Sequence, residues 1–259
     1  MFCYLMKNIN TIWISTAPRT GSMWVFNVAR EINKISGFNV RPEVIPQKDN
    51  EMFEIYHGRA INEINKNIKY ILKVHAILKP DLKRSKIITT IRDPRDLCIS
   101  FKEFMKTDFK RSLNAAKSLI NFYKIYKNFD KNYLLILKYE NIEKKPIEII
   151  LKISDFLNTK ISYNEAMEIS NKFSRDSVIK IINKKKEELK EKIENKSKID
   201  KEEIVVISNE NFRAFDKNTG FQSDHISQRV SGDWRKEFTD EEKKILNEEL
   251  KNWLVEFGY

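Results

Sequence analysis

A short turn at residues 19–22 brings together a cation, two hydroxyl groups and a glycine: Arg19, Thr20, Gly21 and Ser22. Residues 11–16 before it are apolar and β-branched, as in a buried strand, and apolar residues at helical spacing begin after it. A helix that begins directly after a strand presents unpaired backbone N–H groups, which bind phosphate or sulfate oxygens. The turn therefore predicts either an anion site or an ordinary capped connection.

The same turn does not match the phosphate loop of nucleoside triphosphatases, which requires a Gly-Lys-Ser/Thr run. It contains no lysine. No carboxylate suited to Mg²⁺ and no cluster of metal-ligand residues stands out elsewhere. The sequence therefore disfavours a kinase that uses Mg-ATP, and it predicts no metal.

Strands alternate with helices along residues 11–157. The predicted strands are 11–16, 39–45, 68–74, 86–91 and 132–139, of which 39–45 contains Pro42 and suits a sheet edge. The predicted helices are 22–32, 51–67, 94–105, 113–129 and 146–157. This alternation predicts an α/β fold of three layers, α/β/α, with a central, mostly parallel sheet.

Polar side chains follow four of these strands: the Arg19 turn, then Lys73 with His75, then Arg92, then Tyr139. Ligands of open parallel sheets bind at the carboxyl ends of the strands. We therefore expect these residues, which are far apart in the sequence, to meet at one edge of the sheet.

The remaining sequence is more polar. Residues 165–210 predict a charged helical insertion or lid within a single domain of residues 1–259, and 183–203 suit a solvated helix or a partner-binding surface. Residues 208–231 resemble a loop that could cover a site. Thr239 and Glu242 form a capping box before a C-terminal helix with one apolar side.

The composition limits the class of protein. The chain has 259 residues, 41% of them hydrophobic, and two cysteines, and no apolar run is long enough to cross a membrane. These features predict a soluble, cytoplasmic protein without membrane partners. The net charge of +11 favours anionic ligands, but no arginine-rich tail or aromatic-basic pattern indicates nucleic acid. The sequence does not indicate the oligomeric state.

Five segments carry a resemblance to a known family. Residues 17–24 (APRTGSMW) are similar to its phosphosulfate loop, 73–75 (KVH) to its Lys-Thr-His, and 91–100 (IRDPRDLCIS) to its 3′-phosphate segment. Residues 139–141 (YEN) and 232–235 (GDWR) are similar to two later motifs. Together they resemble the sulfotransferases that use 3′-phosphoadenosine 5′-phosphosulfate (PAPS), over most of the chain and with a P-loop-like fold.

The resemblance implies transfer of a sulfuryl group from PAPS to a hydroxyl or amine of a small-molecule or glycan acceptor, with adenosine 3′,5′-bisphosphate (PAP) as product and no metal. His75 would be the general base, because the pKa of imidazole lies near working pH. Lys73 would stabilise the transferring group, and Arg19 the charge on the bridging oxygen of the leaving nucleotide.

Cofactor-binding roles also follow from the resemblance. The phosphates would be bound by the phosphosulfate loop and by the 3′-phosphate segment, and two aromatic rings would contact the adenine. In order, these residues are Arg19, Thr20, Gly21, Ser22, Met23, Arg92 and Ser100 for the phosphates, and Trp24 and Tyr139 for the adenine.

Two departures from the family pattern affect the site. Arg19 stands where the cytosolic enzymes carry lysine, and residues 227–229 read Ser-Gln-Arg where the family has Arg-Lys-Gly. Either Gln228 or Arg229 would then hold the 3′-phosphate, or binding of the 3′-phosphate is weaker than in the family. A catalytically inactive nucleotide-binding protein of the same fold is the alternative function.

Overall fold

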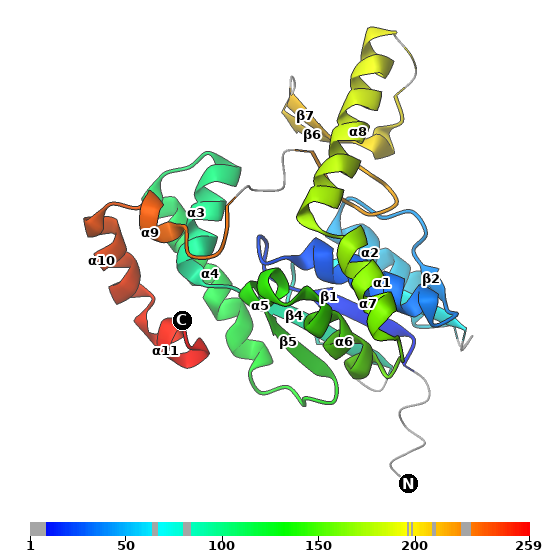
Figure 1. The fold of residues 1–259 in the computed structure, drawn as a ribbon, viewed down its shortest axis with the longest axis horizontal. Helices are drawn as coiled ribbons and strands as arrows, with labels where there is room; N and C mark the ends of the chain where they lie inside the picture. Colours follow the sequence, from blue (N-terminus) through cyan, green and yellow to red (C-terminus); the bar gives the residue numbers. More distant parts are fainter. Residues whose placement is uncertain are drawn as a thin grey trace.

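A five-stranded parallel sheet forms the centre of the computed structural model, which describes residues 9–63, 67–79, 84–195, 197, 199–208, 211–223 and 229–259 (Figure 1). The strand order is β2-β3-β1-β4-β5, and every pairing in this sheet is parallel. The strands are β1 (Thr11–Ser15), β2 (Asn39–Arg41), β3 (Ile68–Val74), β4 (Ser85–Ile91) and β5 (Leu134–Lys138). The predicted α/β class and parallel sheet are confirmed, with β2 at the edge.

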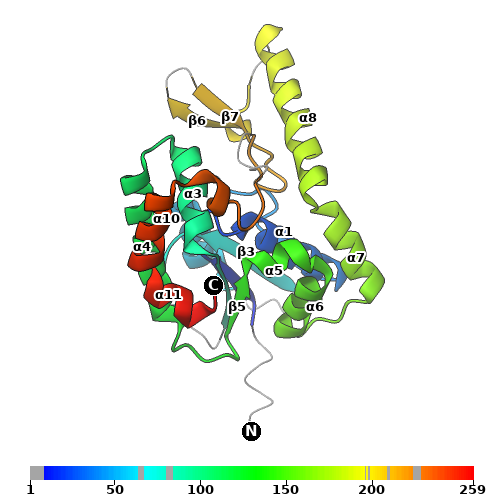
Figure 2. The same cartoon turned by 60° about the vertical axis from the view of Figure 1, so that its left-hand side comes forward.

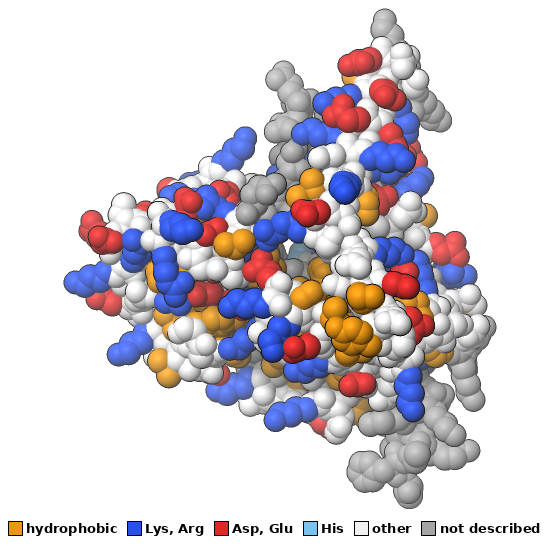
Figure 3. All heavy atoms as spheres, in the orientation of Figure 1, with side chains coloured by type: hydrophobic (Ala, Val, Ile, Leu, Met, Phe, Trp, Pro, Cys, Tyr) orange, Lys and Arg blue, Asp and Glu red, His pale blue; other side chains and the backbone are white. Residues whose placement is uncertain are grey.

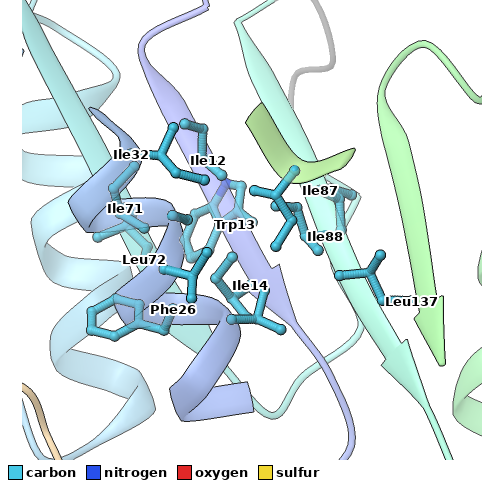
Figure 4. Packing of buried hydrophobic residues seen from close by; sticks show 14 of the residues in the cluster. Ile12, Trp13, Ile14, Phe26, Ile32, Ile71, Leu72, Ile87, Ile88 and Leu137 are labelled. Carbon is cyan, nitrogen blue, oxygen red and sulfur yellow. The ribbon is translucent and has the colours of Figure 1, made fainter. Parts of the chain in front are cut away.

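Helices cover both faces of the sheet because its central strand is buried on both sides. Ile12 and Ile14 of β1 alternate with Trp13 and Ser15, so the two pairs point to opposite faces. The ring of Trp13 lies 5.7 Å from that of Phe53, between centroids. Figure 4 shows side chains from β1, β3, β4, β5 and the first helix meeting in one core.

The helices of one face are α1 (Ser22–Ile35) and α6 (Pro146–Leu157). The other face carries α2 (Asp49–Ile55), the π-helix η2 (Tyr56–Ala60) and α4 (Phe109–Tyr126). The hydroxyl groups of two tyrosines on α4 contact the end of β1. The Tyr126 hydroxyl lies 2.5 Å from the Ser15 hydroxyl, and the Tyr123 hydroxyl accepts from the Ala17 N–H at 3.2 Å. These contacts fix α4 beneath the turn that follows β1.

Beyond β5 the structure departs from the predicted elements. The strand predicted to reach Tyr139 ends at Lys138, and Tyr139 begins α5 (Tyr139–Lys144). Two helices follow α6, namely α7 (Tyr163–Lys172) and α8 (Arg175–Glu194). The polar stretch predicted as a loop begins inside a hairpin of β6 (Ile204–Ser208) and β7 (Asn211–Ala214), which follows the short 3₁₀ helix η3 (Lys201–Glu203). Figures 1 and 2 show α8 and this hairpin standing out from the α/β body.

The C-terminal helices pack beside α3 (Pro94–Met105) and α4 in a second hydrophobic cluster. They are α9 (Trp234–Glu237), α10 (Asp240–Glu249) and α11 (Lys251–Phe257). The predicted capping box of Thr239 and Glu242 is present at the start of α10, but the helix breaks at Leu250 instead of continuing. Within the described residues, no helix combines the length and the apolar character needed to span a bilayer.

Candidate functional site

The carboxyl ends of four neighbouring strands converge as expected. The Arg19 turn follows β1, Lys73 and His75 lie at the end of β3, Arg92 follows β4, and Tyr139 follows β5. Figure 3 shows a small hollow near the centre of this face, bordered by basic and acidic side chains, with a histidine side chain visible inside it. The parallel sheet therefore assembles one cationic site from residues distant in the sequence.

The start of α1 is open to a ligand. Gly21 is the N-cap in the left-handed conformation (φ 86°), and as a glycine it has no side chain that could cap the first turn. A Cβ atom at Gly21 would lie 2.9 Å from Cδ2 of Tyr139, so glycine is required both for the turn and for the close approach of the ring. The Thr20 hydroxyl donates to the Ala17 carbonyl at 2.7 Å and accepts from Thr90 at 2.7 Å. Its side chain thus stabilises the turn.

The Arg92 guanidinium is held beside this helix start. It lies over the ring of Tyr139, 4.2 Å from the centroid, and Nη1 donates to the Arg19 carbonyl at 2.9 Å. Arg92 is buried, and no described residue accepts a hydrogen bond from its Nε. A buried donor without a partner is costly, so this geometry favours an anionic ligand that accepts from it.

Arg19 and Ser100 are in direct contact. The Nε of Arg19 donates to the Ser100 hydroxyl at 3.0 Å, and the guanidinium lies 4.7 Å from the centroid of the Phe104 ring. Burial, with a smaller contribution from the positive charge of Arg92, lowers the pKa of Arg19 from 12.5 to about 10. Arg19 remains charged at neutral pH, and it lies where β1 and α3 can share one ligand.

His75 and Lys73 form a pair beside this cluster. The Nδ1 of His75 lies 2.8 Å from the Thr16 carbonyl, which can only accept, so Nδ1 carries the proton. The other ring nitrogen, Nε2, then accepts from the Lys73 ammonium at 3.0 Å. Burial first, and the charge of Lys73 second, lower the pKa of His75 from 6.5 to about 4. His75 is therefore neutral at physiological pH, with its lone pair directed at Lys73.

Asp49 completes this pair, and sequence reasoning did not identify it. One of its carboxylate oxygens accepts from the His75 backbone N–H at 2.5 Å. Burial lowers the pKa of Lys73, and the charge of Asp49 opposes that effect. Asp49 lies in the first turn of α2, in a stretch that no motif marks.

Gln228 and Arg229 are the two residues predicted to replace the family's late 3′-phosphate motif. Gln228 lies outside the described residues, so its predicted role stays a prediction. Arg229 forms ion pairs of 2.5 Å with both Glu103 and Glu237, and these hydrogen bonds raise its pKa. A role for Arg229 at a phosphate also stays a prediction, and it would require sharing the guanidinium with two carboxylates.

The GDWR segment, residues 232–235, packs against α3. The Asp96 carboxylate accepts from the Gly232 N–H at 2.7 Å and from the Trp234 N–H at 3.2 Å. Arg95 stacks on Trp234, 4.1 Å from the centroid, and pairs with Asp93 at 2.8 Å. These contacts connect the start of α3 to residues 232–235. The residues that make them are Asp93, Arg95 and Asp96, not Arg92.

The other predicted binding residues lie along the first turn of α1. Ser22 is buried, whereas Met23 and Trp24 are half-buried and pack against the main core. Met23 also lies against Gly220, where a Cβ atom would be 2.6 Å from its Cε. The packing of Trp24 accounts for its position without a ligand, and its predicted adenine contact stays a prediction.

The site offers cations, backbone donors and a neutral imidazole. Across the described residues, no group of three or more His, Cys, Asp or Glu side chains is arranged to hold a metal ion. Cations, backbone donors and a neutral imidazole suit a group-transfer reaction that depends on positioning and on charge stabilisation.

The sulfotransferase domain family matches residues 10–258, so the chain belongs to that family. The amine sulfotransferase of Oryctolagus cuniculus is 24% identical over 95% of this chain and 82% of its own length. The luciferin sulfotransferase of Photinus pyralis is 25% identical over 54% of this chain and 40% of its own length.

Solved structures share the fold. Retinol dehydratase in a complex with retinol and PAP has a TM-score of 0.62 at 15% identity, covering 95% of this chain and 82% of that chain. A mouse sulfotransferase complexed with PAP has a TM-score of 0.59 at 17% identity, covering 96% of this chain and 84% of that chain.

Proposed function

We propose that this protein transfers a sulfuryl group from PAPS to a hydroxyl or amine acceptor by in-line displacement, with His75 as general base. One observation carries the proposal: Arg92 contacts the Arg19 carbonyl and His75 contacts the Thr16 carbonyl, so both lie at the turn that leads from β1 into α1. The family membership and the PAP held by related structures support it.

The residues present fit an adenosine bisphosphate. The first turn of α1 would hold the 5′-phosphate with backbone N–H groups. The Nε donor of Arg92 and the Ser100 hydroxyl would hold the 3′-phosphate, in line with their predicted roles. Gly21 leaves room for the Tyr139 ring, which also lies over Arg92, and this ring would contact the base. When bound, PAPS supplies the activated sulfuryl group.

His75 is set up to accept a proton at Nε2. The Thr16 carbonyl fixes the tautomer, and the depressed pKa keeps the ring neutral. An acceptor hydroxyl that reaches Nε2 would replace Lys73 as its donor. Anionic groups beside the ring raise its pKa, because they favour imidazolium, and this makes His75 a stronger base when the site is loaded.

Lys73 and Arg19 would supply positive charge where negative charge develops. Released from Nε2 by the acceptor, the Lys73 ammonium retains Asp49 as a nearby counter-charge. Arg19, in the turn after the neighbouring strand β1, would reach the transferring sulfuryl group as well. Fixed cations in a buried site stabilise developing charge more strongly than water does, since they need no reorganisation.

Ligand binding provides the first test. Thermal unfolding would be followed with PAP, with 5′-AMP and with Mg-ATP, because a ligand that binds the folded state raises the melting temperature. We expect a large shift with PAP, a smaller one with 5′-AMP and none specific to Mg-ATP. A shift with Mg-ATP alone would favour a kinase and contradict the proposal.

Turnover separates the enzyme from an inactive nucleotide-binding protein. We expect His75→Ala to abolish PAPS consumption with a panel of hydroxyl and amine acceptors while PAP binding persists. His57→Ala is the matched control, because His57 is exposed in η2 and contacts Tyr56 instead of the site. A wild-type protein that binds PAP but consumes no PAPS would support the inactive alternative.

A further inference from the structure

An arginine on the hairpin reaches the site. The Arg213 guanidinium, on β7, lies 4.5 Å from the centroid of the Phe104 ring on α3. The Arg19 guanidinium lies 4.7 Å from the same centroid. One aromatic ring therefore contacts a cation from the phosphate-loop turn and a cation from a hairpin that stands apart from the main sheet (Figure 2).

Arg213 has no anionic partner among the described residues, where neither an ion pair nor a side-chain hydrogen bond involves its guanidinium. Arg229, by contrast, is shared by Glu103 and Glu237. The positive charge of Arg213 also contributes to lowering the pKa of Arg19, after burial and Arg92. Two like charges held near one ring repel each other, and an anion placed beside them would relieve that repulsion.

The hairpin and the chain just after it are hydrogen-bonded to residues 45–47, which precede Asp49, the residue that contacts His75. The Gln47 side-chain amide donates to the Ile204 carbonyl at 3.0 Å, and the Ile45 N–H donates to the Lys217 carbonyl at 2.8 Å. Two residues after Gln47, Asp49 accepts from the His75 N–H. The hairpin therefore lies on the His75 side of the site, which an acceptor must reach.

We propose that Arg213 binds an acidic group (carboxylate, phosphate or sulfate) of the acceptor, so that the preferred acceptors are anionic. This inference rests on the proposed function. The nucleotide phosphates have their own donors in Arg92 and the start of α1, whereas Arg213 adds a cation beyond them. Phe104, which both arginines contact, would offer an apolar contact for the part of the acceptor that links its acidic group to its reacting hydroxyl.

Matched acceptor pairs test the proposal. Each pair consists of an acid and its neutral amide with the same hydroxyl: a carboxylated phenol, a hydroxy acid with a primary alcohol, and a uronic acid. We expect kcat/KM of the wild type to be about tenfold or more higher for the acid, as a charge-assisted hydrogen bond would give. PAP affinity is measured on the same samples.

Three variants assign the preference to one side chain. Arg213→Gln should remove the preference for the acid, and Arg213→Lys should retain part of it because the charge remains. Arg59→Gln is the matched control: Arg59 is exposed in η2, whose last residue, Ala60, accepts from Asn10 next to the amino end of β1. Thermal unfolding without ligand checks that each variant is folded.

The outcomes separate the two proposals. A wild type that neither binds PAP nor consumes PAPS would overturn the proposed function, and this inference with it. A wild type that binds PAP but consumes no PAPS with any acceptor would likewise overturn the proposed function. With PAP binding and PAPS consumption both intact, three results would each overturn the inference alone: no preference for acids; a preference that survives in Arg213→Gln; or weaker PAP binding in Arg213→Gln, which would make Arg213 a nucleotide-binding residue.

Discussion

Replacing His75 by asparagine should remove one source of acid sensitivity from the folded protein. Asparagine can keep a side-chain N–H donor toward the Thr16 carbonyl, so the local hydrogen bond is largely preserved. It cannot titrate. The difference in unfolding free energy between wild type and His75→Asn therefore isolates the proton that His75 takes up.

The sign and size follow from the depressed pKa. The pKa of His75 is about 4 in the folded protein, against 6.5 for an unperturbed histidine. Above pH 6.5 the side chain is neutral in both states. Between these values only the unfolded chain binds the proton, so acid favours unfolding. At about 1.4 kcal/mol per pH unit the full difference is about 3 kcal/mol, and partial exposure reduces the effect to about 2 kcal/mol at pH 4.5.

Urea unfolding at pH 7.5, 6.5, 5.5 and 4.5 would measure this difference. The stability of wild type relative to His75→Asn should fall steadily below pH 6.5. His57→Asn, at an exposed histidine outside the site, serves as the control for the replacement itself. A difference that stays constant with pH would show that His75 titrates normally, and it would refute the argument for a buried, neutral base.

Three further predictions concern the turn, the cations and salt. Gly21→Ala should destabilise the protein by about 1–3 kcal/mol more than Gly37→Ala in urea unfolding; both glycines have positive φ, but only at Gly21 would a Cβ meet the Tyr139 ring, while nothing lies within 4 Å at Gly37. Arg92→Gln should weaken PAP binding about tenfold or more by calorimetry, and Arg229→Gln should weaken it less, since Arg229 is paired with two carboxylates. PAP affinity should fall when NaCl is raised from about 0.05 to 0.5 M, and a salt-independent affinity would argue against a charge-based site.

Much of the sheet was predictable because local signals and tertiary packing agree there. The predicted bounds of β3 (Ile68–Val74), α3 (Pro94–Met105) and α6 (Pro146–Leu157) match the structure. Both helices carry proline at their first position, and β3 (IKYILKV) is made of apolar residues apart from Lys69 and Lys73. Parallel strands then place their carboxyl ends together, which is why the positions of Arg92 and His75 followed from sequence.

The parts of the fold and the site that the sequence did not predict depend on contacts between segments that are distant in the sequence. The β6–β7 hairpin lies in a charged, polar stretch; β6 (IVVIS) is a short β-branched run, and β7 (NFRA) has only four residues. Asp49 and Arg213 sit in stretches without a motif, and only the fold places them beside His75 and Phe104. The pairing of Arg229 with Glu103 joins residues 126 positions apart, which no local pattern encodes.

The contact of Asp96 with the backbone of Gly232 and Trp234 has a consequence for the order of assembly. These partners are 136 and 138 positions apart, so the carboxylate is synthesised long before the N–H groups that it accepts from. Until residues 232–234 have been synthesised, the Asp96 carboxylate lacks these two N–H donors and is exposed to water. Arg95, at the start of α3, then also lacks the Trp234 ring on which it stacks in the folded protein. Nascent chains should therefore form the core around β1 first and acquire a competent anion site only late in synthesis, which makes ligand binding a reporter of complete folding.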